Sequence, residues 1–275
     1  MKREQTSPSI FTSQALKKQG PLYFAGLALL AVAKYYYSKA GSHVLLWLLS
    51  PTARLVTALS GIVFTYIPRT GYVSHAYQFI IAGSCSGFQF MTIASAMLFF
   101  SFLPRMETRT KGAVWLGAAV MLSYIYTVFI NSWRILVSVR LPLYLRKRGF
   151  FYAFGTWLTP ERLHTVIGIF IYFSSLLVLY AAAEALFRRA GSGRQMQDAA
   201  FQVKTVPAAL QKRRSWAIPF FWYFAVVLGI PFLNQAWRRD LQAFAGYVLL
   251  MLLVCLPILL LFILAGRILC GKSEG

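Results

Sequence analysis

The sequence predicts an all-α fold, a polytopic membrane bundle of about seven (six to eight) transmembrane helices. Apolar residues make up 58% of the 275 positions and charged residues only 13%. The mean hydropathy is +0.60, and a soluble domain is about 25% charged. This composition excludes an ordinary soluble domain and also a disordered chain, which needs low hydrophobicity. The chain has repeated runs of the roughly 20 apolar residues with which a helix crosses a bilayer.

The candidate spans follow one another with mostly basic connections. They cover 21–37, 44–67, 79–103, 112–137, 164–187, 216–235 and 242–266. The chain thus divides into a basic polar tail (1–20), a membrane core (21–187), a basic loop (188–215) and a C-terminal transmembrane hairpin with a short tail (216–275).

The first two runs allow alternatives. Ala31-Val32-Ala33 resembles a signal-peptidase site, but the run continues into Tyr35-Tyr36-Tyr37, an aromatic belt that is typical of a retained span. Pro51 and Arg54 interrupt the second run, so one segment within 21–67 is alternatively interfacial or re-entrant.

Charge gives a modest indication of orientation. The chain has 28 Lys and Arg against 7 Asp and Glu, a net charge of +21. These bases lie mostly between apolar runs, so we expect no nucleic-acid partner. The loop 188–215 holds the densest bases and is predicted to be cytoplasmic, which places 138–163 outside. Seven full spans would also put the basic N-terminus outside, against the positive-inside rule.

Three reactive side chains lie near the ends of consecutive predicted spans. Cys85 opens the third span among small residues, Arg134 closes the fourth, and His164 opens the fifth. Because adjacent spans are antiparallel, all three are predicted to lie at the same membrane face. A thiol, a fixed cation and an imidazole are the groups that cysteine catalysis requires.

Two further residues are candidates for support. Asn131 is three residues before Arg134 and shares its helix face. Glu161 is three residues before His164, in a helix that Thr159 is expected to cap and Pro160 to begin.

Each reactive group also has an ordinary interpretation when it is taken alone. The cysteine could be inert, as we expect for Cys255 and Cys270, the arginine could extend toward the headgroups, and the histidine could be interfacial. His75 is a weaker alternative base, and His43 lies at a different span boundary.

At these positions the chain resembles the exosortase/archaeosortase family of prokaryotic membrane cysteine proteases or transpeptidases. The resemblance rests on Ser84-Cys85-Ser86-Gly87, on Asn131-Ser132-Trp133-Arg134 and on His164. It covers about 34–187 and is strongest for exosortase K. That subclass is indicated by Tyr36-Tyr37-Ser38, Leu48-Leu49-Ser50-Pro51-Thr52-Ala53-Arg54-Leu55, Gly71-Tyr72-Val73-Ser74 and Phe79-Ile80-Ile81-Ala82. Phe88-Gln89-Phe90 departs from the commoner pattern, and 188–275 shows no recognisable motif.

The resemblance implies a function. Exported proteins that end in a short motif, a transmembrane helix and a basic tail (the PEP-CTERM architecture) would be cleaved at the outer face of the inner membrane. Cys85 would be the nucleophile that forms a thioester, Arg134 would stabilise the thiolate or the oxyanion, and His164 would be the general acid and base. Asn131 and Glu161 would support them. Hydrolysis and transpeptidation both remain open.

The implied partners are exported protein substrates and membrane lipids, with no cofactor and no metal ion. The segment 138–163 would lie over the site as a lid, as a headgroup-binding segment or as a plain interfacial loop.

Alternative functions come from other classes. A transporter would have a similar number of spans but more acidic residues or broken helices at mid-membrane. A non-catalytic envelope or exopolysaccharide assembly protein would make the three reactive groups coincidental. A lipid-modifying enzyme acting on a polyprenyl phosphate would also place arginines at the interface. The sequence has no paired carboxylates, Gly-rich phosphate loop or metal-ligand cluster, which disfavours metalloprotease and nucleotide chemistry.

Overall fold

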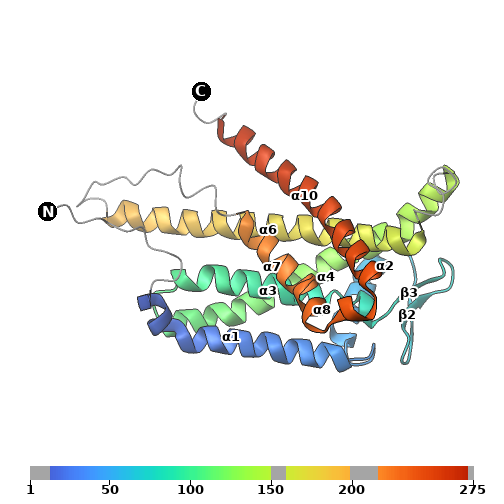
Figure 1. The fold of residues 1–275 in the computed structure, drawn as a ribbon, viewed down its shortest axis with the longest axis horizontal. Helices are drawn as coiled ribbons and strands as arrows, with labels where there is room; N and C mark the ends of the chain where they lie inside the picture. The colour runs from blue at the N-terminus through green and yellow to red at the C-terminus, as the bar shows by residue number, and fades with distance from the viewer. Residues whose placement is uncertain (1–12, 150–158, 199–215, 272–275) are drawn as a thin grey trace.

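The computed structural model describes residues 13–149, 159–198 and 216–271 (Figure 1). The elements are α1 (Ser13–Lys39), α2 (Leu46–Ser60), β1 (Thr65–Ile67), β2 (Gly71–Ser74), β3 (Phe79–Ile81), the 3₁₀ turn η1 (Gly83–Cys85), α3 (Phe88–Phe102), η2 (Leu103–Arg105), α4 (Arg109–Lys147), α6 (Pro160–Asp198), α7 (Ala217–Val227), α8 (Gly229–Leu233), α9 (Ala236–Arg239) and α10 (Leu241–Gly271). The structure is therefore mostly helical, as predicted.

Four helical segments within the described ranges are long and apolar enough to cross a membrane. They are Gly83–Arg105, Arg109–Lys147, Glu161–Arg189 and Leu241–Gly266. The segment Ala217–Leu233 is apolar but shorter, and α1 is long enough but less apolar. The predicted count of seven spans remains a prediction.

The helix α3 is the centre of the bundle. In the most apolar stretch of the segment Gly83–Arg105, which contains α3, 72% of the residues are buried, against 17% for α4 and for α10. Its neighbours α1, α4, α6 and α7 all pack against it. In Figure 1, α10 crosses α6 and then diverges from the bundle. The exposed apolar faces of α4 and α10 are therefore the surfaces that suit a lipid environment.

The predicted second span (44–67) is wrong as a continuous helix. The helix α2 passes through Pro51 without breaking and ends at Ser60. Gly61 caps it, with a φ of 72° and an N–H that donates to the Thr57 carbonyl. A 15-residue helix is about 22 Å long, which is shorter than the hydrocarbon layer.

A small antiparallel sheet follows α2, in the order β1-β2-β3. The all-α prediction missed it, although 65–81 is rich in aromatic and β-branched residues with a Pro68-Arg69-Thr70-Gly71 turn. Gly71 is required there, because its φ is 120° and a Cβ would lie 2.4 Å from the Ile81 carbonyl oxygen.

The helices also extend beyond the predicted spans. The helix α4 continues to Lys147 and α6 to Asp198, so 138–147 and 188–198 are helical rather than loop. At 39 residues α4 is about 58 Å long and projects well past a bilayer core. The rest of the predicted loop, 199–215, lies outside the described residues, as does 150–158.

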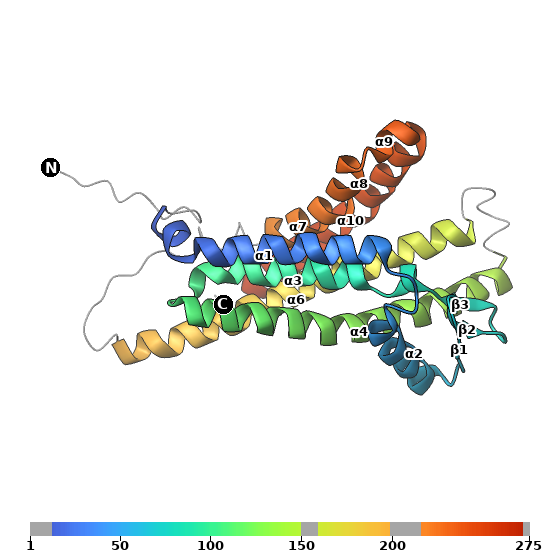
Figure 2. The ribbon, with the colours of Figure 1, turned by 90° about the horizontal axis from the view of Figure 1, so that it is seen from below.

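The N-terminal prediction needs a similar correction. The helix α1 begins at Ser13, so 13–20 is helical rather than part of a tail, and 1–12 lies outside the described residues. Its last turns reach the same end of the bundle as the start of α3, the last third of α4 and the start of α6 (Figure 2). The antiparallel order therefore gathers the candidate residues at one end, next to the sheet.

Candidate active site

Cys85 lies in a turn fixed on both sides. It ends η1, four residues after β3, and its N–H donates to the Ala82 carbonyl over 2.8 Å. The buried Ser42 hydroxyl accepts a hydrogen bond from the Gly83 N–H and donates one to the Thr70 carbonyl. Cys85 therefore lies in the 3₁₀ turn that begins the apolar segment Gly83–Arg105, three residues before α3 itself. Its side chain is half-buried and unbonded to another cysteine.

Gly87 turns the chain from Cys85 into α3. It has a φ of 78°, and a Cβ there would lie 3.0 Å from Thr127 Cγ2 and 3.1 Å from Asn131 Cγ. Only glycine satisfies both the backbone and this close approach to α4. The small residues around Cys85 therefore set the distance between its turn and α4.

Arg134 is a buried cation with three neighbours. Only 8% of it is exposed. Its Nη2 lies 2.8 Å from His164 Nε2, its Nη1 donates to the Tyr172 hydroxyl over 3.4 Å, and its Nε has no hydrogen-bond partner. Gly168 leaves room for it, since a Cβ there would lie 3.2 Å from Nε.

His164 joins Arg134 to Cys85. It lies in the first turns of α6, whose Pro160 start and Thr159 cap are confirmed by the bond from the Arg162 N–H to the Thr159 hydroxyl. His164 Nε2 is 4.0 Å from Cys85 Sγ. Because arginine has donors only, Nε2 must accept from Arg134, which assigns the imidazole proton to Nδ1.

Asn131 connects the Cys85 backbone to Tyr172, the hydroxyl partner of Arg134. Its Nδ2 donates to the Cys85 carbonyl over 2.8 Å, and its Oδ1 accepts from the Tyr172 hydroxyl over 2.7 Å. The residue is fully buried. The predicted shared face of Asn131 and Arg134 is confirmed, because both side chains meet Tyr172.

Arg134 has no carboxylate partner among the described residues. Glu107 pairs with Lys111, Glu184 pairs with Arg105 and Arg188, and Asp240 accepts the Ala243 N–H. An uncompensated buried cation costs several kcal/mol. The nearby Cys85 side chain, whose sulfur is 4.0 Å from the His164 nitrogen that Arg134 contacts, becomes an anion when it loses its proton.

Glu161, the second predicted supporting residue, lies apart from this group. It is exposed in the first turn of α6, and its carboxylate interacts with the Thr159 hydroxyl. The side chains of His75, in the turn after β2, and of His43, just before α2, are also exposed. Cys255 is buried in α10, and the side chain of Cys270 lies outside the described part.

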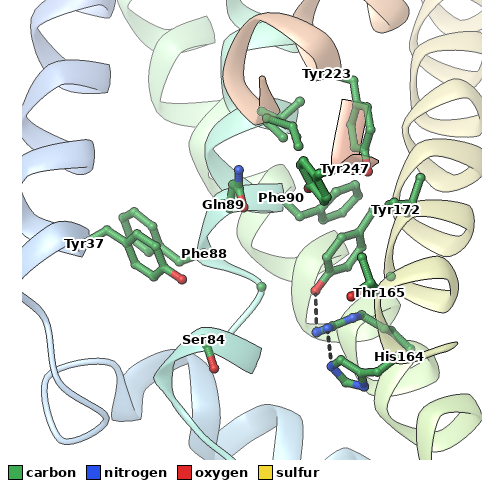
Figure 3. Close-up of a pocket in the computed structure, with 16 residues that line it drawn as sticks. Tyr37, Ser84, Phe88, Gln89, Phe90, His164, Thr165, Tyr172, Tyr223 and Tyr247 are labelled. Atoms are coloured by element: carbon green, nitrogen blue, oxygen red, sulfur yellow. Dashed lines mark hydrogen bonds between the residues drawn. The ribbon is translucent and has the colours of Figure 1, made fainter. Parts of the chain in front are cut away.

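A cavity of about 180 Å³ lies beside the three reactive groups (Figure 3). Arg134 and His164 line it, together with Ser84 and Gly87 on either side of Cys85, although Cys85 itself does not. The wall opposite His164 and Tyr172 is formed by Tyr37, stacked on Phe88 with ring centroids 5.1 Å apart. The remaining lining residues are Gln89, Phe90, Ile93, Thr165, Gly168, Ile169, Tyr172, Tyr223, Val227 and Tyr247.

Sequence analysis missed Tyr172, Gly168 and Tyr37. A signal for the first two is present, because His164, Gly168 and Tyr172 follow one another at four-residue intervals and so share one helix face. Tyr37 was predicted only as part of the Tyr35-Tyr36-Tyr37 aromatic belt and of the Tyr36-Tyr37-Ser38 motif. No local pattern places it at the cavity, which it reaches from α1.

Within the described ranges, no three His, Cys, Asp or Glu side chains gather closely enough to hold a metal ion. Comparisons with protein-family models, with curated proteins and with solved structures found no match to this chain.

Proposed function

We propose that this chain is an exosortase-like membrane cysteine peptidase or transpeptidase. Its substrates are exported proteins that carry a C-terminal sorting signal, a transmembrane helix and a basic tail. The observation that carries the proposal is the convergence of Cys85 Sγ, His164 Nε2 and the Arg134 guanidinium, with separations of 4.0 Å and 2.8 Å. Nucleophile-to-base distances are often long without substrate and shorten in the reactive complex.

The chemistry proceeds in two halves. His164 Nε2 takes the Cys85 proton, Arg134 turns from Nε2 to the sulfur, and the thiolate attacks the scissile carbonyl carbon. Arg134 stabilises the developing oxyanion. The C–N bond breaks, His164 returns the proton to the leaving amine, and a thioester remains. Water or an acceptor amine then gives its proton to His164 and displaces the sulfur, which regains a proton.

The helix directions support a site on the outer face of the inner membrane. In this proposal α1 and the α7–α8 segment also cross, whereas α2 and the sheet lie at the outer interface. Together with the four long apolar segments this makes six crossings. Both termini and the basic loop 188–215 are then cytoplasmic, which removes the conflict with the positive-inside rule. A fluorescent protein fused to either terminus is expected to fluoresce in the cytoplasm.

The decisive experiment is co-expression with a tailed reporter, followed by intact-mass measurement of the reporter. The variants are wild type, Cys85→Ala and the matched control Cys255→Ala, which removes a buried thiol 170 residues away in α10. Wild type and Cys255→Ala are expected to remove the tail, and Cys85→Ala is expected not to. A mass increment on the shortened product means transpeptidation, and its absence means hydrolysis.

Two results would count against the proposal. Cleavage by Cys85→Ala would exclude the thiol as nucleophile. Survival of a panel of different tails in the presence of wild type would instead favour a non-catalytic membrane protein.

A further inference from the structure

The contacts around Cys85 form a closed ring that returns to the residue where it starts. From the Cys85 carbonyl the ring passes to Asn131 over 2.8 Å and to the Tyr172 hydroxyl over 2.7 Å. It continues to Arg134 over 3.4 Å and to His164 over 2.8 Å, and it ends at the Cys85 sulfur over 4.0 Å. The residues come from η1, α4 and α6, so the ring ties three elements together.

Tyr172 is the member of this ring that contacts both Asn131, which holds the Cys85 turn, and Arg134. A tyrosine hydroxyl has one proton and two lone pairs, so it can donate to Asn131 and accept from Arg134 at the same time. The donation holds the Asn131 amide with its nitrogen toward the Cys85 carbonyl. The acceptance holds the guanidinium toward His164. One hydroxyl therefore orients the turn that carries the thiol and the cation that interacts with it.

The Tyr172 ring is held by packing that does not involve its hydroxyl. It is stacked on Phe90, with centroids 4.7 Å apart and planes 11° apart, and Cζ of the Arg134 guanidinium lies over the ring, 5.2 Å from its centroid. Replacement by phenylalanine therefore keeps the ring in place and removes only the two hydrogen bonds. Arg134 would then lack a hydrogen-bond partner at Nη1, as it already does at Nε.

We infer that Tyr172 is a positioning residue that sets the reactivity of the Cys85 thiol through Asn131 and Arg134. The inference rests on the proposed role of Cys85 as nucleophile. Loss of a residue that orients a metal ligand typically costs about 10- to 100-fold in activity, and we expect an effect of about this size when a residue that orients a reactive side chain is lost. A merely structural Tyr172 would affect thermal stability and leave the thiol's reactivity unchanged.

The test measures the alkylation of Cys85 by iodoacetamide in the full-length membrane protein. The modified Cys85 peptide is quantified by mass spectrometry over a range of pH, which separates it from the other two cysteines. Tyr172→Phe is expected to react about tenfold more slowly than wild type at pH 7 and to show a displaced pH profile. Tyr172 replaced by 4-aminophenylalanine, which restores a donor toward Asn131, is expected to recover part of the rate.

Tyr126→Phe is the matched control. Tyr126 also bridges α4 and α6, donating to the Ser175 carbonyl over 2.9 Å, and it also contacts Phe90. Among the described residues, Tyr126 has no contact with the closed ring of contacts around Cys85. Its variant is expected to lose thermal stability comparably and to keep the wild-type alkylation rate within about twofold. An unchanged rate in Tyr172→Phe, or equal slowing in both variants, would overturn the inference.

A second variant keeps the test decisive if Tyr172→Phe does not accumulate. Asn131→Leu keeps the number and branching of the side-chain heavy atoms and breaks the ring at its next member, so it is expected to slow alkylation in the same way. Because alkylation needs no peptide substrate, its outcome is independent of tail cleavage. Slowed alkylation in a protein that cleaves no tail would reject the proposed function and leave the positioning role standing.

Discussion

Arg134 and His164 meet over 2.8 Å, although they enter from antiparallel helices and are 30 residues apart in the chain. The contact holds a cation against a neutral imidazole instead of against a carboxylate. The Nε2 lone pair accepts the hydrogen bond from Arg134, and the same nitrogen lies 4.0 Å from the Cys85 sulfur. The pair is thus arranged to exchange partners once a proton moves from sulfur to nitrogen.

Replacement of Arg134 by lysine is expected to reduce kcat for tail cleavage about a hundredfold or more. Lysine keeps the charge, but it lacks the planar fork that reaches His164 and Tyr172 together. Single-turnover assays would measure the loss. The control is Arg140→Lys, since the exposed Arg140 side chain donates to the Ser60 carbonyl over 3.4 Å. A near-normal rate for Arg134→Lys would show that charge alone suffices.

His164→Ala is expected to reduce kcat by about 10²- to 10⁴-fold, the usual contribution of a general acid and base. His75→Ala tests the alternative base, which lies exposed in the turn after β2. We expect its cleavage rate to stay within about twofold of wild type. The reverse order of effects in the same assay would exchange the two assignments.

Glu161→Gln is expected to change the cleavage rate by less than about threefold. The carboxylate is exposed and interacts with Thr159 at the start of α6, not with the reactive groups that it was predicted to support. A loss comparable to that of His164→Ala would restore the predicted supporting role. The measurement is the initial rate of reporter cleavage at matched protein levels.

Gly168→Ala is expected to reduce kcat roughly tenfold, as expected for a displaced outer contact of a reactive group. The added Cβ would lie 3.2 Å from Arg134 Nε, and the guanidinium has little freedom to retreat because Tyr172 and His164 hold it. Gly117→Ala is the control, since a Cβ there meets nothing within 4 Å. It is expected to keep activity and to gain up to about 1 kcal/mol of helix stability. Full activity in Gly168→Ala would mean that the cation moves freely.

Gly87→Ala is expected to destabilise the protein more than Gly61→Ala. Both positions have positive φ values, 78° and 72°, so both variants bear a backbone cost of about 1–2 kcal/mol. Only at Gly87 does the new Cβ also press against Thr127 and Asn131. Thermal unfolding in detergent measures the difference, which isolates the cost of moving α4 from the Cys85 turn. Equal losses would show that this approach is not tight.

Much of the site was predictable because it depends on periodicity and direction. The three-residue spacing of Asn131 and Arg134 places them on one face in any α-helix. The order of Cys85, Arg134 and His164 along successive antiparallel helices places them at one end. The position of Tyr172 was also predictable from periodicity, since it continues the four-residue spacing from His164 through Gly168.

Other features depend on contacts between distant segments. The sheet at 65–81 was missed because a short apolar run suits a strand or a helix equally well until its partner is known. The side chain of Glu161, predicted to support His164, interacts with Thr159 instead, because three-residue spacing fixes a helix face but leaves the side chain free to choose its partner. The position of Tyr37 opposite Arg134 follows from the packing of α1, which no local pattern encodes.

The sequence by itself determined a mostly helical, membrane-suited chain and the end of the bundle at which its reactive groups gather. Hydrophobicity and helical periodicity are properties of single segments, so they can be read without the fold. The tertiary structure alone decided that Arg134 has a histidine instead of a carboxylate partner, and that Tyr172 closes a ring back to Cys85. Those contacts require distances of about 3 Å between helices, and only the packing of whole helices fixes such distances.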